Sequence, residues 1–334
     1  MYNSKITGLG FYVPDTVVTN DDLAKLMDTN DAWIQERTGI KERHWIPEGS
    51  EDTSAIMGVK AAKIAIERSG LSKDDIDFIV FATLSPDYYF PGCGVMVQNL
   101  LELPTVGAID IRNQCSGFIY ALSTADQFIK TGMYKNILVI GAEYHSNGLD
   151  KTTRGRGVSV IFGDGAGACI LSRSEDTTKG ILSSHLHSEG KYADKLIVKS
   201  PSIAHWVPEI IASNGEDISY FPYMDGTFVF KNAVVRFSEV ILEGLHANKL
   251  EASDIDMFIP HQANLRISQF VQKKFGLTDS QVYNNIMKYG NTTAASIIIA
   301  LTEAWEKGKI KDNDLVVLAA FGSGFTWGSI IIRW

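Results

Sequence analysis

The strongest constraint on how this chain folds is a pattern that occurs twice along it. In the first half a helical pattern leads into residues 71–80 (LSKDDIDFIV), and in the second a helical pattern leads into residues 250–259 (LEASDIDMFI). Both halves have the order helix, strand, helix, strand, helix, strand, and such self-similarity marks a repeated structural unit. We therefore predict an α/β fold of two duplicated halves, residues 1–174 and 175–334, each built on a mixed sheet.

The composition is that of a soluble globular protein long enough to form both halves. The 334 residues are 45% hydrophobic and 21% charged, and the net charge of −8 argues against a broad nucleic-acid-binding surface. Three cysteines without a CxxC spacing suit a reducing compartment. The N-terminal residues do not resemble a signal peptide, and no apolar run is long enough to span a membrane. We expect a cytoplasmic protein without membrane insertion.

Cys115 follows a predicted strand and precedes a predicted helix. Residues 106–111 form an apolar run typical of a buried strand, and residues 118–129 have helical spacing without proline. The first N–H groups of a helix are unpaired, and the helix dipole favours negative charge there. We therefore predict that Cys115 ionises easily and acts as a nucleophile. The alternative is a small buried hydrophobic residue, which is a common role of free cysteine.

The duplication assigns two further residues to the same region. Asn291 lies as far before Gly308, where a helix of the second half ends, as Cys115 lies before Gly132 in the first half. His261 follows an apolar run, and sites in open α/β sheets lie at such strand ends. We predict that Cys115, His261 and Asn291 meet near the pseudo-twofold axis between the halves. The alternative for His261 is a hydrogen-bonded histidine of the protein core.

Trp33 and Arg37 lie one helical turn apart and share a helix face. A flat aromatic ring beside a guanidinium could hold a nucleotide base and a phosphate. The alternative is a tryptophan that only packs a surface helix.

Two other patterns are not expected to bind a ligand. The glycine-rich residues 162–167 (FGDGAG) lie between predicted strands at 158–161 and 168–171, whereas a phosphate-binding loop leads into a helix. We therefore predict a tight hairpin turn there. His185 and His187 alternate on one strand face, but without a nearby third ligand we predict no metal site.

Six segments together resemble the thiolase superfamily and, more closely, the β-ketoacyl-acyl-carrier-protein synthase III family. Each alone is a weak signal, but the resemblance runs nearly from end to end. The segments are Trp33 with residues 37–40 (RTGI), then 115–118 (CSGF), 162–167 (FGDGAG), 261–266 (HQANLR), 289–296 (YGNTTAAS) and 321–328 (FGSGFTWG).

This resemblance implies a thiolase-like, five-layered αβαβα fold that forms a homodimer. The implied activity is the decarboxylative Claisen condensation of an acyl-CoA primer with a malonyl-acyl carrier protein. Acyl-CoA is then a substrate, and no metal or cofactor is required. An acyltransferase or thioester hydrolase of the same fold, acting without decarboxylation, remains the alternative.

The resemblance also implies residue roles. Cys115 would take the acyl group, with the backbone N–H groups of Cys115 and Ser323 as the oxyanion hole, and His261 and Asn291 would bind the malonyl thioester carbonyl. Trp33 would stack on adenine together with Arg154 or Arg156, of which ungapped counting back from residue 162 favours Arg156. The other implied residues are Thr29 and Arg37 beside the adenine, Gly226, Phe230, Ala263 and Asn264 along the pantetheine channel, Phe90 and Phe321 in the acyl pocket, and Lys231 and Arg266 for docking the carrier protein.

Overall fold

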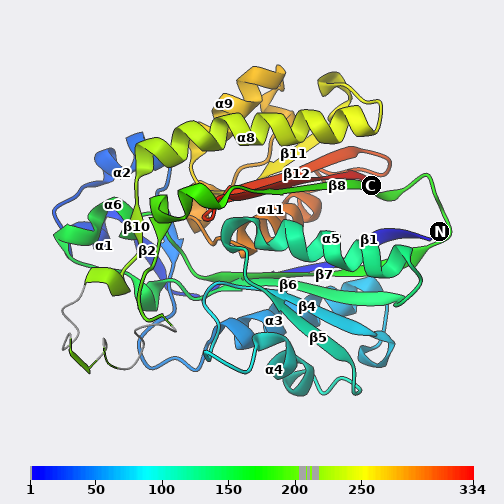
Figure 1. The fold of residues 1–334 in the computed structure, drawn as a ribbon, viewed down its shortest axis with the longest axis horizontal. Coiled ribbons are helices and arrows are strands. Elements are labelled where there is room, and N and C mark those ends of the chain that lie inside the picture. The colour runs from blue at the N-terminus through cyan, green and yellow to red at the C-terminus, as the bar shows by residue number, and fades with distance from the viewer. Residues whose placement is uncertain (1, 203–207, 209–210, 213–217) are drawn as a thin grey trace.

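The structure is a computed structural model that describes residues 2–202, 208, 211–212 and 218–334. Two sheets lie face to face with a layer of helices between them and a further layer of helices on each outer face (Figure 1). The predicted five-layered αβαβα architecture is therefore confirmed. The outer helices are α3 (Ser54–Ser69) and α4 (Cys93–Leu100) on one side and α8 (Gly226–Ala247) and α9 (Leu265–Phe275) on the other, and α5 (Gly117–Lys130) and α11 (Ala295–Glu306) form the central layer.

The first sheet is mixed, with the order β1-β7-β6-β4-β5. Strands β4, β5 and β6 run parallel to one another, whereas β7 pairs antiparallel with both β6 and β1. The bounds are β1 (Asn3–Tyr12), β4 (Phe78–Ala82), β5 (Gly107–Ile111), β6 (Asn136–Glu143) and β7 (Gly165–Ser174).

The second sheet repeats this arrangement with the order β11-β12-β13-β8. Strand β11 is parallel to β12, and β13 pairs antiparallel with β12 and β8, as their counterparts do in the first sheet. A single parallel bridge between Phe258 and Val282 takes the place that β5 has beside β4. The predicted duplication is thus present in the strand order. The bounds are β8 (Gly180–Ser188), β11 (Met257–Pro260), β12 (Leu315–Gly322) and β13 (Thr326–Arg333).

The chain passes from the first sheet to the second between Ser174, which ends β7, and Gly180, which begins β8. We propose that the two halves divide in this connection, at residues 174 and 175.

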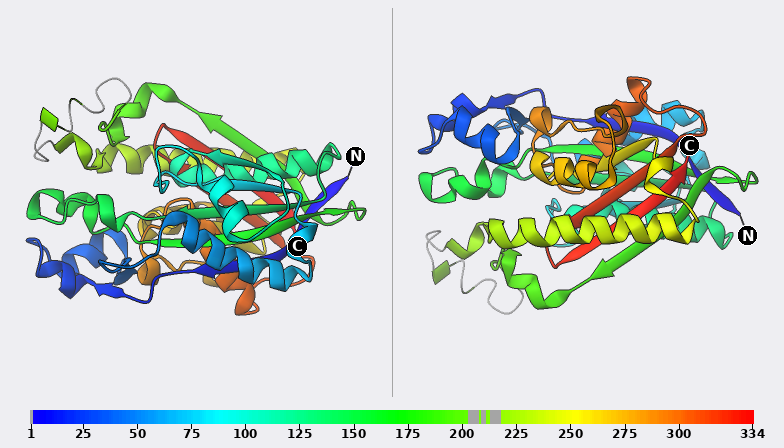
Figure 2. Two further views of the ribbon diagram at one scale, coloured as in Figure 1. Left: turned by 90° about the horizontal axis from the view of Figure 1, so that it is seen from below. Right: turned by 90° about the horizontal axis from the view of Figure 1, so that it is seen from above.

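Smaller elements gather at the end of the molecule opposite the two termini (Figures 1 and 2). This end lies over the carboxyl ends of the parallel strands, where sites in α/β folds form. The elements are β2 (Val17–Thr19), α1 (Asn20–Ala24), α2 (Asp31–Thr38), β3 (Glu42–His44), α6 (Arg156–Ser159), β9 (Leu196–Ile197), β10 (Tyr223–Met224) and α10 (Ile286–Tyr289).

Capping residues determine where the helices begin and end, and buried side chains determine how they pack. Thr53 caps α3 by accepting a hydrogen bond from the backbone N–H of Ile56, and Gly70 ends it with a φ of +73°. Gly10 of β1 allows α3 to approach closely, since a Cβ there would lie 2.4 Å from the carbonyl oxygen of Ala61. Helix α11 is buried on all sides along most of its length, because it lies between two sheets.

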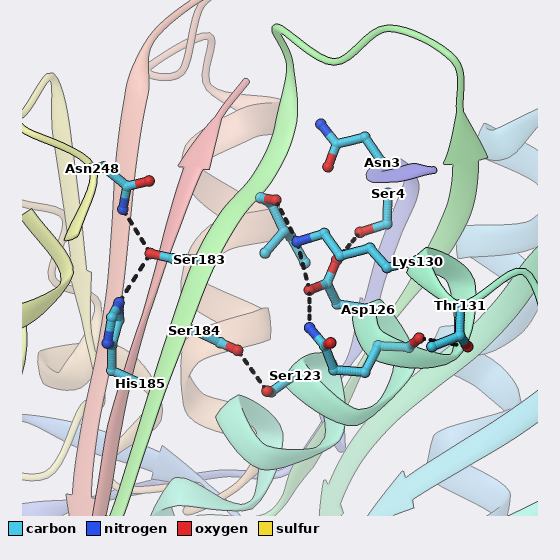
Figure 3. A network of polar contacts seen from close by, with 12 residues as sticks. Asn3, Ser4, Ser123, Asp126, Lys130, Thr131, Ser183, Ser184, His185 and Asn248 are labelled. Carbon is cyan, nitrogen blue, oxygen red and sulfur yellow. Dashed lines mark hydrogen bonds and ion pairs between the residues drawn. The ribbon is translucent and has the colours of Figure 1, made fainter. Parts of the chain in front are cut away.

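Helix α5 is tied to both halves by polar contacts along its length (Figure 3). The carboxylate of Asp126 accepts hydrogen bonds from Ser4 Oγ of β1 at 2.6 Å and from Lys130 Nζ at 2.9 Å. One turn before Asp126, Ser123 Oγ lies 2.7 Å from Ser184 Oγ of β8. These contacts fix the helix that follows Cys115 against strands of both sheets.

Two local predictions are wrong. Residues 158–161 do not form a strand, because α6 and the turn after it occupy them, so residues 162–167 are not a hairpin turn. Strand β5 is not buried but lies at the edge of its sheet with partly exposed residues. None of the helices among the described residues is long and apolar enough to cross a membrane.

Candidate active site

One cavity of about 610 Å³ brings residues of both halves together. Most residues of the predicted site line it, namely Trp33, Arg37, Cys115, Gly226, Phe230, Lys231, His261, Ala263, Asn264, Arg266, Asn291 and Phe321. Cys115, His261 and Asn291 form what we call the buried end of the cavity, since they are 8%, 3% and 5% exposed. Trp33, Arg37, Lys231 and Arg266, which are partly or fully exposed, form its mouth.

Cys115 lies in a single 3-10 turn, Gln114–Ser116, that leads directly into α5. The end of β12 passes so close that a Cβ on Gly322 would lie 2.5 Å from the Cβ of Cys115. This approach brings the backbone N–H of Ser323 into hydrogen-bonding contact with the thiol, which the backbone N–H of Cys115 also reaches. Two backbone N–H groups therefore lie beside the sulfur, and their use as an oxyanion hole for an acyl group on Cys115 stays a prediction.

The thiol of Cys115 does not ionise as easily as its place before a helix predicts. Burial raises its pKa to about 12, and the negative charge of Glu143 adds to this effect. The backbone N–H groups of Ser323 and Cys115 and the Thr293 side chain act in the opposite direction, but they do not outweigh the loss of solvation. The expectation of a thiol activated by the helix end alone is therefore wrong.

His261 follows β11, and its imidazole lies at the buried end with both nitrogens in distinct surroundings. Nδ1 lies 2.6 Å from Ser296 Oγ of α11, which also accepts a hydrogen bond from the backbone N–H of Gln262. Nε2 is buried and has no hydrogen-bond partner among the described residues. Burial lowers the pKa of His261 to about 3, so the ring is neutral at pH 7.

Asn291 is held in a loop between α10 and α11. Its backbone N–H donates to the carbonyl oxygen of Ile161 at 2.9 Å, and its carbonyl oxygen accepts from the N–H of Gly163 at 3.1 Å. Its side-chain Oδ1 accepts from the backbone N–H of Thr293 at 2.8 Å. The orientation of the side-chain amide is thus fixed by the loop itself.

An arginine pair lies on the Trp33 ring at the mouth. The Arg37 guanidinium is 4.5 Å from the ring centroid and the Arg156 guanidinium is 5.4 Å from it. Arg154 instead forms an ion pair with Asp150 at 2.5 Å and lies over the ring of Phe221. Of the two arginines left open by the sequence, the geometry therefore favours Arg156 beside Trp33.

Thr29 and the residues of the predicted channel lie in the same region. The Thr29 Oγ1 atom is buried without a hydrogen-bond partner among the described residues, although the residue does not line the cavity. Asn264 caps α9 and donates from Nδ2 to the carbonyl oxygen of Arg37 at 2.9 Å, which joins the second half to α2. The Arg266 guanidinium lies 5.6 Å from the ring centroid of Phe230.

The two residues of the predicted acyl pocket are in different places. Phe321 is buried at the end of β12 and lines the cavity. Phe90 is 77% exposed in the loop before α4 and does not line the cavity of this chain. A role for Phe90 in an acyl pocket therefore requires a second chain, as the resemblance implies.

Three polar residues near the buried end escaped the sequence analysis. Thr293 Oγ1 lies 2.7 Å from His145 Nε2, and Glu143, two residues before His145, is fully buried. Residue 293 lies within the segment 289–296 that carries the family resemblance, and its φ of +47° is unusual for threonine. Glu143 and His145 come after a predicted strand, and neither belongs to a sequence motif that indicates a functional role.

The two histidines considered for a metal site are paired with a carboxylate. Glu243 of α8 lies 3.3 Å from His185 Nδ1 and 2.6 Å from His187 Nε2. Over the described part of the chain, no group of three or more histidine, cysteine, aspartate or glutamate residues is arranged to hold a metal ion.

Two family models match the chain. Residues 109–190 match the model described as 3-oxoacyl-[acyl-carrier-protein (ACP)] synthase III, and residues 245–334 match the model of the C-terminal part of that enzyme. The two matched regions contain Cys115 and both His261 and Asn291, respectively.

Full-length relatives carry the same description. The β-ketoacyl-[acyl-carrier-protein] synthase III of Ehrlichia canis is 44% identical over 333 residues, which cover 100% of both chains. That of Sulfurimonas denitrificans is 44% identical over 328 residues, covering 97% of this chain and 96% of the relative. The crystal structure of 3-oxoacyl-[acyl-carrier-protein] synthase III from Aquifex aeolicus matches with a TM-score of 0.90 and 42% identity, covering 99% of this chain and 100% of that one.

Proposed function

Because the chain belongs to the β-ketoacyl-acyl-carrier-protein synthase III family of the thiolase superfamily, we propose that Cys115, His261 and Asn291 carry out its condensation reaction. The chain is a condensing acyltransferase that initiates fatty-acid synthesis. The observation that carries the residue assignment is the presence of all three side chains, from both halves, at the buried end of one cavity.

Acyl transfer from acyl-CoA is the role of Cys115. Its sulfur attacks the thioester carbonyl as the thiol loses its proton, and CoA leaves as a thiolate that takes up a proton from solvent. The backbone N–H groups of Ser323 and Cys115 stabilise the negative charge that develops on the carbonyl oxygen. One thioester replaces another, so the products lie at nearly the same energy as the reactants.

Decarboxylation of the malonyl group is assisted by His261. The bond to the carboxylate breaks, CO₂ leaves, and the electron pair forms an enolate whose charge lies on the thioester oxygen. We assign the proton of the neutral imidazole to Nε2, with the Ser296 hydroxyl accepting from the N–H of Gln262 and donating to Nδ1 of His261. The otherwise unpartnered Nε2–H then donates to the enolate oxygen.

Asn291 supplies the second donor to the enolate. Because its Oδ1 already accepts from the N–H of Thr293, its Nδ2 group is the part of the amide that donates. The carbanion attacks the acyl carbonyl on Cys115, and the cysteine leaves as a thiolate. Two neutral donors in a water-poor site suffice for this chemistry, which therefore requires no metal or cofactor.

The mouth of the cavity binds the carrier of each acyl group. Trp33, Arg37 and Arg156 hold the nucleotide of CoA by stacking and by charge, with Thr29 beside them. Lys231 and Arg266 are exposed at the mouth and dock the acidic carrier protein. The pantetheine arm then passes the remaining residues that line the channel, which are Gly226, Phe230, Ala263 and Asn264.

The protein acts as a cytoplasmic homodimer in this proposal. Strand β5 is an exposed edge of its sheet and offers unpaired backbone groups to a second copy. The neighbouring loop exposes Tyr88 and Phe90, and Val95 of α4 is also exposed. Apolar exposure next to an open sheet edge is typical of a protein interface.

Intact-mass analysis with a panel of acyl-CoA primers, followed by measurement of CO₂ release from malonyl-acyl carrier protein, tests this proposal. We expect one acyl adduct that maps to Cys115 and release of CO₂ from the malonyl group in step with condensation. An adduct that is transferred or hydrolysed without any release of CO₂ would identify an acyltransferase or hydrolase instead.

A further inference from the structure

A second histidine, His145, lies near the thiol of Cys115, and the hydroxyl group of Thr293 contacts both side chains. His145 Nε2 is 2.7 Å from Thr293 Oγ1, and the Thr293 side chain is also in hydrogen-bonding contact with the thiol. Neither His145 nor Thr293 lines the cavity that holds the predicted substrate site. The three side chains therefore form a chain of contacts that leads from the sulfur away from the cavity.

Thr293 is held in its position at a conformational cost. Its φ of +47° lies in the left-handed region, which a β-branched residue rarely adopts. The conformation is maintained by the hydrogen bond from its backbone N–H to Asn291 Oδ1 and by the N–H of Ser296, which donates to its carbonyl oxygen at 3.2 Å. The strained loop thereby directs the hydroxyl between Cys115 and His145.

His145 is also held in place. Its backbone N–H donates to Asp164 Oδ1 at 2.7 Å, and its ring lies 4.7 Å from the ring of Phe162. Asp164 bonds in addition to the backbone N–H and the hydroxyl of Ser146, so the turn after β6 is fixed by one carboxylate.

We propose that His145 accepts the proton of the Cys115 thiol through the hydroxyl of Thr293. The S–H proton moves to Thr293 Oγ1 as the proton of that hydroxyl moves to His145 Nε2, which leaves a thiolate, an unchanged threonine and an imidazolium. The proton stays on His145 while Cys115 carries the acyl group, and the reverse transfer through Thr293 returns it when Cys115 leaves as a thiolate after condensation. This assignment rests on the proposed role of Cys115 as the acyl acceptor.

Proton transfer to His145 reduces the free-energy cost that burial adds to ionisation of Cys115. An isolated thiolate is costly in this position, because burial raises the pKa of Cys115 to about 12. Internal transfer forms an ion pair without changing the net charge of the site, and opposite charges in a poorly solvated region attract strongly. Burial also lowers the pKa of His145 to about 3, so its imidazole is neutral in the resting enzyme, and the imidazolium forms only together with the thiolate whose charge stabilises it.

The other titratable groups around His145 define the charge balance. Glu143 is the last residue of β6, two residues before His145. Asp164 accepts a hydrogen bond from the backbone N–H of His145, and His261 interacts with His145 electrostatically. Burial raises the pKa of Glu143 to about 7 and also raises that of Asp164. A carboxylate at either position favours the imidazolium of His145 and disfavours the thiolate of Cys115. Neither Glu143 nor Asp164 alone therefore accounts for proton transfer from Cys115 to His145.

The test measures alkylation of Cys115 by iodoacetamide, mapped by mass spectrometry, between pH 6 and 9 in the absence of acyl-CoA. The ion pair binds as many protons as the uncharged pair, so the parent has a component of the rate that does not depend on pH. In His145→Gln, which keeps a hydrogen-bonding group beside Thr293, the thiol must lose its proton to solvent. Its rate is therefore expected to be at least about tenfold lower at neutral pH and to rise about tenfold per pH unit.

Two threonine variants and one histidine control complete the test. Thr293→Val removes the hydroxyl and is expected to behave like His145→Gln, whereas Thr293→Ser keeps the hydroxyl and is expected to retain the pH-independent component. His187→Gln is the matched control, because His187 pairs with Glu243 and stacks on Trp327. Thermal unfolding establishes that each variant is folded, and His145→Gln decides the question if Thr293→Val does not fold.

Alkylation of His145→Gln with the rate and pH profile of the parent would overturn the proposal. A purely structural role for His145 would lower the melting temperature without removing the pH-independent component, and this outcome would overturn it as well. These results are separate from a failure of the proposed function, in which acyl-CoA forms no adduct on Cys115 of the parent itself.

Discussion

The buried end and the mouth of the cavity differ in how their side chains are held. At the buried end, His261 Nδ1 is held by Ser296 of α11, and Asn291 Oδ1 is held by the backbone N–H of Thr293 in its own loop. At the mouth, the Arg37 side chain is exposed, forms an ion pair with its neighbour Glu36 at 3.2 Å and lies on the Trp33 ring. The first region presents buried donors in fixed positions, whereas the second presents exposed charged side chains around an aromatic ring.

In the proposed mechanism, the buried end carries out the chemistry and the mouth recognises the substrates. Hydrogen bonds to a developing charge gain strength where water is excluded and the donors do not have to reorganise. Exposed charges are screened by salt and contribute little to stability, but they attract an oppositely charged partner from a distance. We therefore expect substitutions at the buried end to abolish steps, and substitutions at the mouth to change the response to substrate and salt.

The largest effect is expected for Cys115→Ala. This variant keeps its fold, because the side chain is small, but it forms no acyl adduct with acyl-CoA in intact-mass analysis. Cys169→Ala is the matched control, since Cys169 is a buried cysteine of β7. An adduct that survives in Cys115→Ala, or that maps to Cys169, would remove Cys115 from the mechanism.

Charge reversal at the mouth is expected to have a smaller effect than loss of a residue at the buried end. Lys231→Glu and Arg266→Glu should lower kcat/KM with malonyl-acyl carrier protein by about tenfold or more, because electrostatic steering of an acidic partner is lost. The rate with malonyl-CoA should change far less, and added salt should mimic the substitutions in the parent. Lys274→Glu on the same helix, α9, is the control. Equal losses with both malonyl donors would contradict docking at the mouth.

Phe90→Ala is expected to change selectivity rather than rate. If Phe90 closes the acyl tunnel of a partner chain, the smaller residue admits longer primers, and each methylene that gains a place contributes about 0.8 kcal/mol. Comparison of kcat/KM for acetyl-, butyryl-, hexanoyl- and octanoyl-CoA measures the shift, with light scattering to follow the dimer. Tyr88→Ala removes a neighbouring exposed aromatic ring and serves as the control. An unchanged chain-length profile in an intact dimer would show that Phe90 is not the floor of the tunnel.

The smallest effect is expected for Glu143→Gln and is measured as stability. Burial raises the pKa of Glu143 to about 7 from 4.5, so the folded state binds the proton more tightly than the unfolded state. The resulting stabilisation is fully present below about pH 4.5 and is lost as the pH rises through about 7. The variant, which cannot ionise, should therefore lose less melting temperature than the parent between pH 5 and pH 8.

Glu303 provides a control of opposite sign. Lys307 and Asn285 hold the pKa of Glu303 below its ordinary value, so its stabilisation is present at neutral pH and is lost as the pH falls. Glu303→Gln should thus be destabilised more at pH 7 than at low pH. The same pH trend in both variants would contradict the difference between the two carboxyl groups.

The sequence predicts the architecture because the duplication repeats at the level of hydrophobic periodicity. Cys115, His261 and Asn291 could be selected because each lies where a strand pattern gives way to a turn or a helix, and the structure brings them to one cavity. In contrast, residues 106–111 form an apolar strand in either environment, so their composition does not distinguish an exposed edge from a buried position.

Other features depend on contacts between distant parts of the chain. Three of the four residues 158–161 are β-branched and favour a strand. In the structure they form a helix end and a turn instead, where the carbonyl oxygen of Val160 accepts from Arg43 Nη2 at 2.8 Å and that of Ile161 accepts from the N–H of Asn291. The raised pKa of Cys115 results from burial by the loop after β12, which no local pattern reports. His145 is a single histidine whose position relative to Thr293 is set only by the fold.

The most direct test of the account is the separation of the two half-reactions in His261→Ala and Asn291→Ala. Both variants should form the acyl adduct on Cys115 as the parent does, whereas CO₂ release from malonyl-acyl carrier protein should fall by about 10²–10³, the usual loss when one oxyanion donor is removed. Intact mass and CO₂ release are measured on the same preparations. Parent rates of decarboxylation in both variants would contradict the assignment of the enolate to the buried end of the cavity.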